Sequence, residues 1–285
     1  MNYNEFFAGC TSEPASRLKF FCMTTHYKVN PDLSRHDFDL SSFSFVSSDV
    51  VIDVHHHHCY QMAIAIDKPF DCLIGGDFLG QTWGFLANQN VLHSRDASDS
   101  QLLVSYVDTE SLLGQTLKNM LDGSDYIEIE SILGKAPLKN VIPVDHENLS
   151  DMELRKHINT FFCDFFLEYM PVDPILTDVR IQKTIRFIED NLSEKIKVEN
   201  VAERLFLSPD RARHYFTEQT GLPISQFVIW KRIRKISEAV ILKKISVTEA
   251  CMQYGFVDYS HFSRTFKGMF GIKPKYLFND CRVIL

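Results

Sequence analysis

The sequence predicts an α+β protein of two domains, in which an N-terminal β-barrel with flanking helices precedes an all-α C-terminal domain. Apolar residues alternate with polar ones from Phe43 to about Val107, whereas from Asp178 onward they recur at helical spacings. The length of 285 residues is about twice that of a typical domain. Hydrophobic residues at 45% and charged residues at 24% are ordinary for a soluble globular chain, so disordered, collagen-like and coiled-coil classes are excluded.

Short strands separated by turn residues are expected between Phe43 and Val107. Gly75 and Gly76 provide the positive φ angles that a tight hairpin needs. Further turns are predicted at residues 67–69 (Asp-Lys-Pro) and 88–90 (Asn-Gln-Asn). A single small barrel or sandwich accommodates such a meander.

Two helices are predicted after the strands, at residues 110–121 and 149–170. The second carries an apolar stripe with spacings of three and four, formed by Leu154, Ile158, Phe161, Phe162, Phe165 and Tyr169. The stripe could form a dimer seam, which we favour, or cover the open side of the barrel. Pro171 and Pro174 end the helix, so the predicted units are a regulatory domain (1–148), a helix with its linker (149–174) and a C-terminal domain (175–285).

Charge divides the chain at the same place. The net charge of −7 hides an acidic part, residues 1–174, with 11 Lys+Arg against 25 Asp+Glu. Residues 175–285 hold the remaining 19 basic against 12 acidic residues, so the two parts carry −14 and +7. A basic domain of this kind is compatible with a polyanionic partner.

The predicted location is the cytoplasm, with no membrane span. Apolar runs are short, and the N-terminus lacks a basic segment followed by an apolar core. The seven cysteines are scattered and form no CxxC pair, so we expect reduced thiols.

The basic domain contains an internal repeat. Residues 198–227 resemble residues 247–277, with Val198 aligned to Val247 and Phe216 to Phe266. Each copy has the outline of a helix-turn-helix: a short helix, a turn, and a longer helix closed by glycine. The second helices are expected to start at the N-caps Ser208 (followed by Pro209) and Asp258, and to end at Gly221 and Gly271.

Helical periodicity separates the buried from the exposed side of each second helix. The residues expected inside are Ala212, Tyr215, Phe216, Phe262, Phe266 and Met269. The residues left outside are rich in hydrogen-bond donors suited to base edges and phosphates. A single copy could be an ordinary solvated helix, but two copies in a basic domain favour binding to nucleic acid.

The second copy resembles the AraC/XylS family of bacterial transcription regulators. The motif residues stand at the family's spacing, namely Gly255, Phe256, Asp258, Ser260, His261, Phe262, Ser263, Arg264, Phe266, Lys267, Gly271 and Pro274. The first copy matches through Val201, Ala202, Leu207, Ser208, Phe216, Thr220 and Gly221, and the connecting helix through Arg232 and Ile233. The resemblance covers about 100 residues.

This resemblance implies a seven-helix domain that binds double-stranded promoter DNA. Its recognition helices, residues 209–219 and 259–269, joined by a long helix at Ile224–Leu242, would enter major grooves roughly 34 Å apart. The implied base-reading residues are Arg211, Arg213, His214, Tyr259, Ser260, His261 and Arg264. The implied phosphate contacts are Lys231, Lys243, Lys244, Lys267 and Lys273. The expected partners are RNA polymerase, a second copy of the chain and an unidentified small-molecule or protein effector, with activation as the expected mode.

Three residues depart from the family pattern. Ile236 and Cys251 replace the usual small residues and are expected to alter packing only. Asp210 places an anion beside the expected DNA face, where it could pair with Arg211 or Arg213 or accept from a cytosine amine.

Residues 55–94 resemble the cupin type of barrel that precedes the DNA-binding unit in many members of this family. The candidate pocket residues are His55, His57, Tyr60, Met62, Trp83, Phe85 and His93. His55 and His57 would share one face of a strand and His93 could converge with them, as in metal-dependent cupins. However, Gln61 stands where those enzymes carry an acidic ligand, and regulatory barrels of the family mostly lack metal.

We therefore expect no metal, no cofactor and no catalytic activity. The alternative is a metal-dependent cupin enzyme with an appended nucleic-acid module. A further alternative is a barrel that binds another protein and no small ligand.

Overall fold

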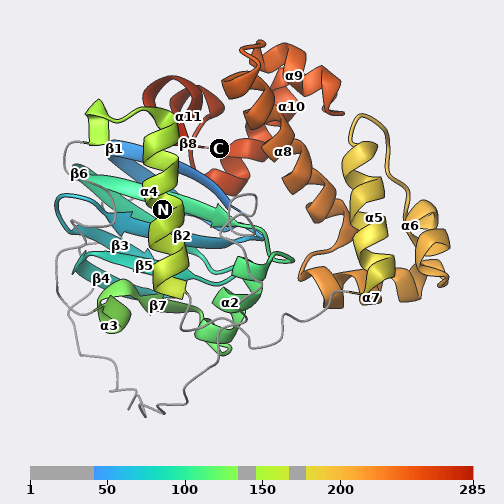
Figure 1. The fold of residues 1–285 in the computed structure, drawn as a ribbon, viewed down its shortest axis with the longest axis horizontal. Coiled ribbons are helices and arrows are strands. Elements are labelled where there is room, and N and C mark those ends of the chain that lie inside the picture. Colours follow the sequence, from blue (N-terminus) through green and yellow to red (C-terminus); the bar gives the residue numbers. More distant parts are fainter. Residues whose placement is uncertain (1–41, 134–145, 167–177, 285) are drawn as a thin grey trace.

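The computed structural model describes residues 42–133, 146–166 and 178–284, and Figure 1 shows their arrangement. The end of the helix predicted to reach residue 170, the stripe residue Tyr169 and the prolines 171 and 174 lie outside the described residues. A curved, nearly closed antiparallel sheet forms the N-terminal domain, and helices form most of the C-terminal domain. The predicted fold class is therefore confirmed.

The sheet contains eight strands within the described part of the chain. Their bounds are β1 Ser42–His55, β2 Tyr60–Ala65, β3 Phe70–Ile74, β4 Asp77–Thr82, β5 Gly84–Ala87, β6 His93–Val107, β7 Tyr126–Glu128 and β8 Arg282–Ile284. The order is β4-β3-β6-β2-β5-β7, and β1 lies on the other side of β6. The long strand β6 thus pairs with β1 along its length and with β3 and then β2 opposite, which curves the sheet around its own core.

The predicted turns lie between these strands. Gly75 and Gly76 connect β3 to β4 with φ of +61° and +97°, the left-handed conformation that a two-residue hairpin loop needs. Residues 67–69 join β2 to β3, and residues 88–90 join β5 to β6. Local turn chemistry therefore located the hairpins correctly.

Helices flank the barrel on its outer side. They are α2 Leu112–Leu121, α3 Ile129–Leu133 and α4 Asp151–Phe166, with a 3₁₀ turn at His146–Asn148. Leu154, Ile158 and Phe162 of α4 are buried in one cluster with outward-facing residues of the sheet and with α2. These three residues of the stripe therefore cover the barrel, the second of the two roles considered.

Seven helices build the C-terminal domain among the described residues. They are α5 Val179–Asp190, α6 Val198–Leu205, α7 Pro209–Thr220, α8 Ile224–Leu242, α9 Val247–Gln253, α10 Tyr259–Phe270 and α11 Pro274–Asp280. Figure 1 shows α8 running between the α6–α7 pair and the α9–α10 pair. The two predicted helix-turn-helix units and the long helix between them are thus observed.

The chain ends in a strand, which the sequence analysis missed. Phe45 and Val46 of β1 pair with Val283 and Arg282 of β8, so the last described residues extend the barrel sheet. Arg282 also binds the segment before α4, donating to the carbonyls of His146 and Leu149 at 2.6 and 2.5 Å. The helical C-terminal domain is therefore followed by a short strand, β8, that was not predicted.

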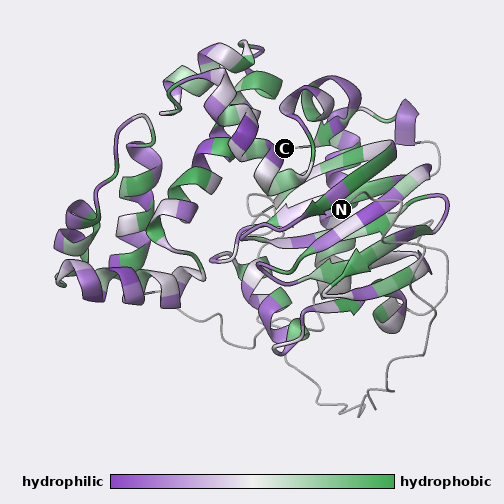
Figure 2. Cartoon of the chain, turned by 180° about the vertical axis from the view of Figure 1, so that it is seen from behind, coloured by the Kyte–Doolittle hydropathy of each residue, from purple (hydrophilic) through white to green (hydrophobic). Residues whose placement is uncertain are grey.

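The two domains share a hydrophobic core. Phe43, Phe45 and Tyr106 of the barrel lie in one buried cluster with Trp230 of α8 and Phe270 of α10. The ring of Tyr106 meets that of Phe270 edge-on with centroids 4.7 Å apart. Hydrophobic residues gather in the sheet, while the outermost helices carry mainly hydrophilic residues (Figure 2).

No helix among the described residues is both long and apolar enough to cross a membrane. The thiols of Cys59, Cys72, Cys251 and Cys281 are free.

Candidate nucleic-acid interface

Helix α7 is the second helix of the first helix-turn-helix unit. Pro209 occupies its first turn after Ser208, which takes the N-cap position without a side-chain hydrogen bond. Ala212 and Phe216 are fully buried against the first unit, which fixes the opposite face toward solvent. Gly221 ends the helix in the left-handed conformation, with φ of +75°.

Helix α10 repeats this construction in the second unit. The carboxylate of Asp258 accepts a hydrogen bond from the backbone amide of His261 at 2.7 Å, which caps the helix. Phe262, Phe266 and Met269 are buried as predicted. Gly271 ends α10 with φ of +70°.

The candidate base-reading residues all lie on the exposed sides of α7 and α10. Exposed side chains are found at Arg211, Arg213, His214, Tyr259, Ser260, His261 and Arg264. Four of the candidate phosphate contacts are exposed as well, namely Lys243, Lys244, Lys267 and Lys273. The structure thus leaves these eleven residues accessible to a ligand.

A shallow hollow on α10 gathers three cations. Arg264, Lys267 and Lys273 line it together with the small residues Ser263 and Gly268. No atom lies within 4 Å of the position that a Cβ on Gly268 would occupy, so the backbone is open to a close approach there. Cationic walls around an accessible backbone suit a phosphate group.

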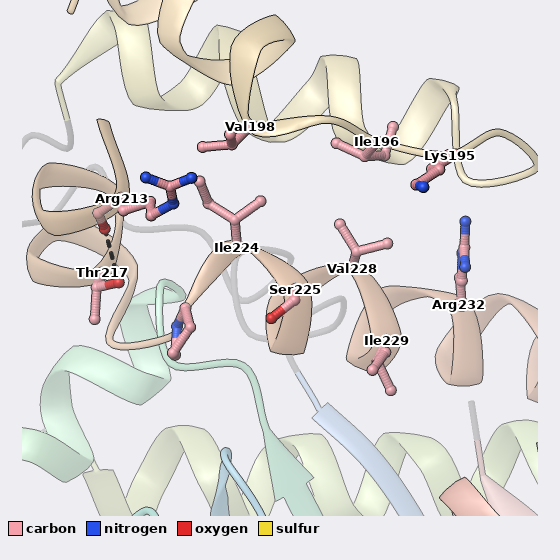
Figure 3. A pocket seen from close by; sticks show the side chains of 11 residues that line it. Lys195, Ile196, Val198, Arg213, Thr217, Ile224, Ser225, Val228, Ile229 and Arg232 are labelled. Atoms are coloured by element: carbon pink, nitrogen blue, oxygen red, sulfur yellow. Dashed lines mark hydrogen bonds between the residues drawn. The ribbon is translucent and has the colours of Figure 1, made fainter. Parts of the chain in front are cut away.

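A second groove lies between α7, the start of α8 and the segment before α6 (Figure 3). The end of Lys195 lies close to that of Arg232 at one end of the groove, and Arg213 lies at the other end, with apolar side chains between them. Lys195 was not among the predicted contacts, because it belongs to a loop with no helical pattern. Asp210 pairs with Arg213 at 2.5 Å, and both side chains are exposed.

Arg232 connects the segment between α5 and α6 to the turn of the second helix-turn-helix unit. Its guanidinium donates to the carbonyls of Leu192 and Glu194 at 2.9 and 2.7 Å, and to that of Gly255 at 2.9 Å. Gly255 lies in the turn of the second unit, and a Cβ there would lie 2.6 Å from the carbonyl of Leu192. The family's arginine at this position is therefore a structural link in this chain.

Lys231 requires a correction. It was predicted to contact phosphate, but its ammonium is buried and bonded to Asp108 at 2.8 Å, to Glu110 at 2.8 Å and to Glu189 at 3.0 Å. Asp108 and Glu110 follow strand β6, so Lys231 faces the barrel. A cation with three carboxylate partners is not available to DNA in this arrangement.

Asp108 is the centre of this contact between the domains. Its carboxylate accepts from the indole nitrogen of Trp230 at 2.6 Å, from Lys231 at 2.8 Å and from Arg234 at 2.6 Å. Burial alone would raise the pKa of Asp108, but the charges of Arg234 and Lys231 outweigh it and hold this pKa below its usual value. Burial and the charge of Asp108 instead raise the pKa of Glu110.

The barrel also touches the ends of both recognition helices. At α7, the hydroxyl of Thr109 donates to the carbonyl of Thr220. At α10, a Cβ on Gly271 would lie 2.4 Å from Ile52 and 2.9 Å from the ring of His55. The barrel therefore constrains both helices in this arrangement.

The candidate pocket residues do not form one site. His55, His57, His93 and Phe85 lie within the barrel, where Phe85 touches His93 with ring centroids 5.8 Å apart. Tyr60 and Met62 lie on the opposite face of β2, packed with α2 and α4, because alternate residues of a strand point to opposite sides. Trp83 borders the clusters on both sides of the sheet. The prediction of a single pocket is therefore wrong for Tyr60 and Met62.

Burial keeps the three histidines in the barrel neutral. It lowers the pKa of His55 to about 3 and that of His57 to about 4, and it also lowers the pKa of His93. Neighbouring imidazoles and the buried cation Arg95 add to these shifts. Neutral imidazole is the form that accepts hydrogen bonds or binds metals.

Comparison with known proteins agrees with this geometry. Residues 201–279 match the family model of a helix-turn-helix domain. The arabinose operon regulatory protein of Escherichia coli is 30% identical over 101 residues, a match covering 34% of each chain. The C-terminal domain is therefore similar to the helix-turn-helix domain of AraC/XylS-type regulators. This match spans only about a third of the length of the arabinose operon regulatory protein.

Likeness to AraC/XylS-type proteins extends beyond the matched domain. The probable transcriptional regulator LumQ of Photobacterium leiognathi is 24% identical over 77% of this chain and 90% of its own. A structure of ToxT from Vibrio cholerae covers 84% of this chain and 97% of its own, with a TM-score of 0.54 and 12% identity. The fold of barrel followed by double helix-turn-helix is therefore shared with ToxT.

Proposed function

We propose that this protein is a sequence-specific transcription regulator whose helices α7 and α10 enter two successive major grooves of promoter DNA. The observation that carries the proposal is the repeated helix-turn-helix unit. In both copies the apolar side of the second helix is buried, and a side rich in hydrogen-bond donors is exposed. The positive charge of residues 175–285 supports the same conclusion.

Base reading is assigned to the seven exposed residues of α7 and α10, and phosphate contact to Lys243, Lys244, Lys267 and Lys273. Arg264 has the guanidinium fork that pairs with guanine through two hydrogen bonds. Asp210 holds Arg213 in an ion pair, so Arg213 must exchange this partner for a base when DNA binds. Lys231 is not one of the proposed phosphate contacts, because its ammonium is paired with three carboxylates.

The barrel is assigned a regulatory role. It contacts α8 through Asp108 and touches the ends of both recognition helices, so an effector that changes the barrel's packing changes how the helices are held. One ToxT structure contains a bound unsaturated fatty acid. For this chain we propose a small-molecule or protein effector at the barrel, without a catalytic step.

Further assignments follow from the role as a promoter regulator. We propose that the chain acts as a homodimer in the cytoplasm and activates transcription through contact with RNA polymerase. A relative from Escherichia fergusonii, 30% identical over 99 residues, is the transcriptional activator RhaS. Because Leu154, Ile158 and Phe162 of α4 are buried within the chain, we propose that the dimer forms through another surface.

The test begins with selection of bound fragments from genomic DNA, followed by two variants of α10. Arg264→Ala should weaken binding by about 1–3 kcal/mol and relax specificity at one base position. Lys267→Ala, in the same hollow, should weaken all sequences about equally and reduce the salt dependence of binding. Unchanged affinity and specificity in both variants would contradict the assignment of α10.

A further inference from the structure

Three imidazole rings meet inside the barrel. His55 ends β1 and pairs across the ladder with His93, which begins β6. The ring centroid of His93 lies 4.3 Å from that of His55 and 4.9 Å from that of His57. All three side chains are at most 6% exposed, whereas His56 is exposed and His58 only partly buried. The end of β1, the start of β6 and the connection between β1 and β2 thus bring His55, His93 and His57 together.

The hydrogen bonds of these rings determine where each proton lies. The Nδ1 atoms lie 2.9, 3.1 and 2.9 Å from the backbone carbonyls of Asp53, Cys59 and Val91, respectively. Because a carbonyl can only accept, each neutral ring carries its proton on Nδ1 and its lone pair on Nε2. All three Nε2 atoms are buried and have no hydrogen-bond partner within 3.5 Å, although the side chain of Gln61 adjoins the ring of His57.

Three buried lone pairs without a donor are unfavourable unless a cation or a donor lies between them. We propose that His55, His57 and His93 bind a divalent transition-metal ion, represented by zinc, through their Nε2 atoms. Nδ1–H groups anchored on backbone carbonyls are the support that metal-binding histidines require. One ligand nitrogen from each ring lies within 4.8 Å of the other two. Tetrahedral zinc needs its ligand nitrogens about 3.4 Å apart, so the three rings must move closer together to bind it.

Arg95 specifies the charge of the fourth ligand. It lies two residues after His93 on the same side of β6, is fully buried, and none of its guanidinium nitrogens has a hydrogen-bond partner. A dication beside an unpaired guanidinium requires a compensating negative charge in an interior of low dielectric. We therefore assign the open coordination position to a small anion, with acetate as the probe.

The site adjoins the second recognition helix. The ring of His55 lies against Gly271, where a Cβ would come within 2.9 Å of its Nδ1. The ring of His57 meets Tyr106 edge-on at 5.0 Å, and Tyr106 meets Phe270 at 4.7 Å. Closure of the rings on a metal therefore moves groups that contact the end of α10. The metal site stands by itself, whereas this regulatory consequence rests on the proposed function.

Titration of Co²⁺ into the chelator-treated, tag-free full chain tests the site. We expect one Co²⁺ per chain with the intense visible absorption of tetrahedral cobalt, reversed by excess Zn²⁺ and altered by acetate. His93→Gln should weaken Co²⁺ binding on the order of 100-fold. The matched control, His56→Gln with His58→Gln, removes the two remaining histidines of the run and should leave binding unchanged.

Three results would overturn the proposal: no saturable binding to the wild-type chain, the weak absorption of octahedral cobalt, or loss of binding in the control while His93→Gln retains it. The last result would indicate chelation by the outer histidines. X-ray absorption of the zinc-loaded wild-type chain needs no variant and covers the case in which His93→Gln does not fold. Imidazole scattering at about 2.0–2.1 Å supports the site, and an all-oxygen shell contradicts it.

DNA binding by the metal-free and the Zn²⁺-loaded chain separates this inference from the proposed function. We expect both forms to bind the selected fragments, with affinities that differ by about 5-fold or more. Equal affinities would overturn the regulatory consequence. Absence of DNA binding in both forms would overturn the proposed function and leave the metal site standing.

Discussion

Asp108 offers the sharpest test of how the two domains are held together. In the variant Asp108→Asn the side chain keeps its shape but loses the charge that faces Lys231 and Arg234. Breaking a buried ion pair by removing one partner costs about 3–5 kcal/mol, because the other charge stays buried. The lower end of this energy range applies to Asp108→Asn, because Glu110 and Glu189 remain bonded to Lys231 and the asparagine oxygen still accepts one hydrogen bond. We therefore expect a loss of about 3 kcal/mol.

Thermal unfolding of the full chain measures this loss. At about 2–4 °C per kcal/mol for a chain of this size class, the midpoint should fall by roughly 6–12 °C. Tryptophan emission gives a second signal, because the chain has only two tryptophans and the indole of Trp230 is bonded directly to Asp108. A change in emission before the main transition would show that the domains separate first.

The control is Glu189→Gln, which removes a charge from the same cluster. Glu189 belongs to α5, so its bond to Lys231 stays within the C-terminal domain, and its side chain is 36% exposed. Because Glu189 is partly exposed and Asp108 and Glu110 still neutralise Lys231, we expect this change to cost about 1 kcal/mol or less. Equal midpoints for the two variants, or an unchanged midpoint for Asp108→Asn, would refute the conclusion that Asp108 holds the domains together.

Three further substitutions test the structure elsewhere. Gly271→Ala should lower the midpoint of thermal unfolding more than Gly221→Ala, although both substitutions add a Cβ to a left-handed residue. The new Cβ at Gly271 would lie 2.4 Å from the branched side chain of Ile52, whereas at Gly221 it would lie 3.1 Å from the flexible amide of Gln89. Equal losses in the two midpoints would contradict this expectation. Arg232→Lys should lower the free energy of unfolding, measured with denaturant, by about 1.5–3 kcal/mol, because an ammonium group cannot bind all three carbonyls at once as the guanidinium does. A loss below about 0.5 kcal/mol would contradict the linking role of Arg232. Arg282→Ala should speed amide exchange in β8, and exchange at the wild-type rate would show that the strand pairing alone holds the C-terminus.

The helical domain was predictable because its signals are local. The spacing of Ala212 and Phe216 determines which side of α7 is buried, and Asp258 and Gly271 mark the ends of α10 within a few residues of the positions they affect. The range of α8 that the family resemblance implied, Ile224–Leu242, also matches the observed one. Each of these features depends on neighbours less than about two helical turns away.

The contacts between the domains were not predictable, because they join residues far apart in sequence. Lys231 has the exposed-cation pattern of a phosphate contact, and only its partner Asp108, 123 residues away, reveals its different role. The same applies to β8: three residues after a helix carry no strand signal until β1 provides a partner. Burial in such cases is set by docking of the domains rather than by local periodicity.

The histidine cluster in the barrel was predictable from the sequence only in part. The predicted convergence of His55, His57 and His93 is observed, but β1 ends at His55, so His57 reaches the cluster from the connection to β2 rather than by alternation along a strand. Alternation, applied to Tyr60 and Met62, would have assigned them to one side of β2, but the sequence did not show which side faced the histidines. The orientation of the rings depends on the backbone carbonyls of Asp53, Cys59 and Val91, for which the sequence has no signal.

The arrangement of these contacts explains how one barrel can influence two helices at once. The segment that follows β6 provides Asp108 for α8 and Thr109 for the end of α7, and the preceding Tyr106 packs against the end of α10. A shift of this one segment therefore reaches both helix-turn-helix units, which α8 joins to each other. Simultaneous binding in two grooves requires a fixed spacing between the recognition helices, so an effector need not touch either helix to change promoter affinity. It is sufficient that it moves residues 106–109 relative to α8.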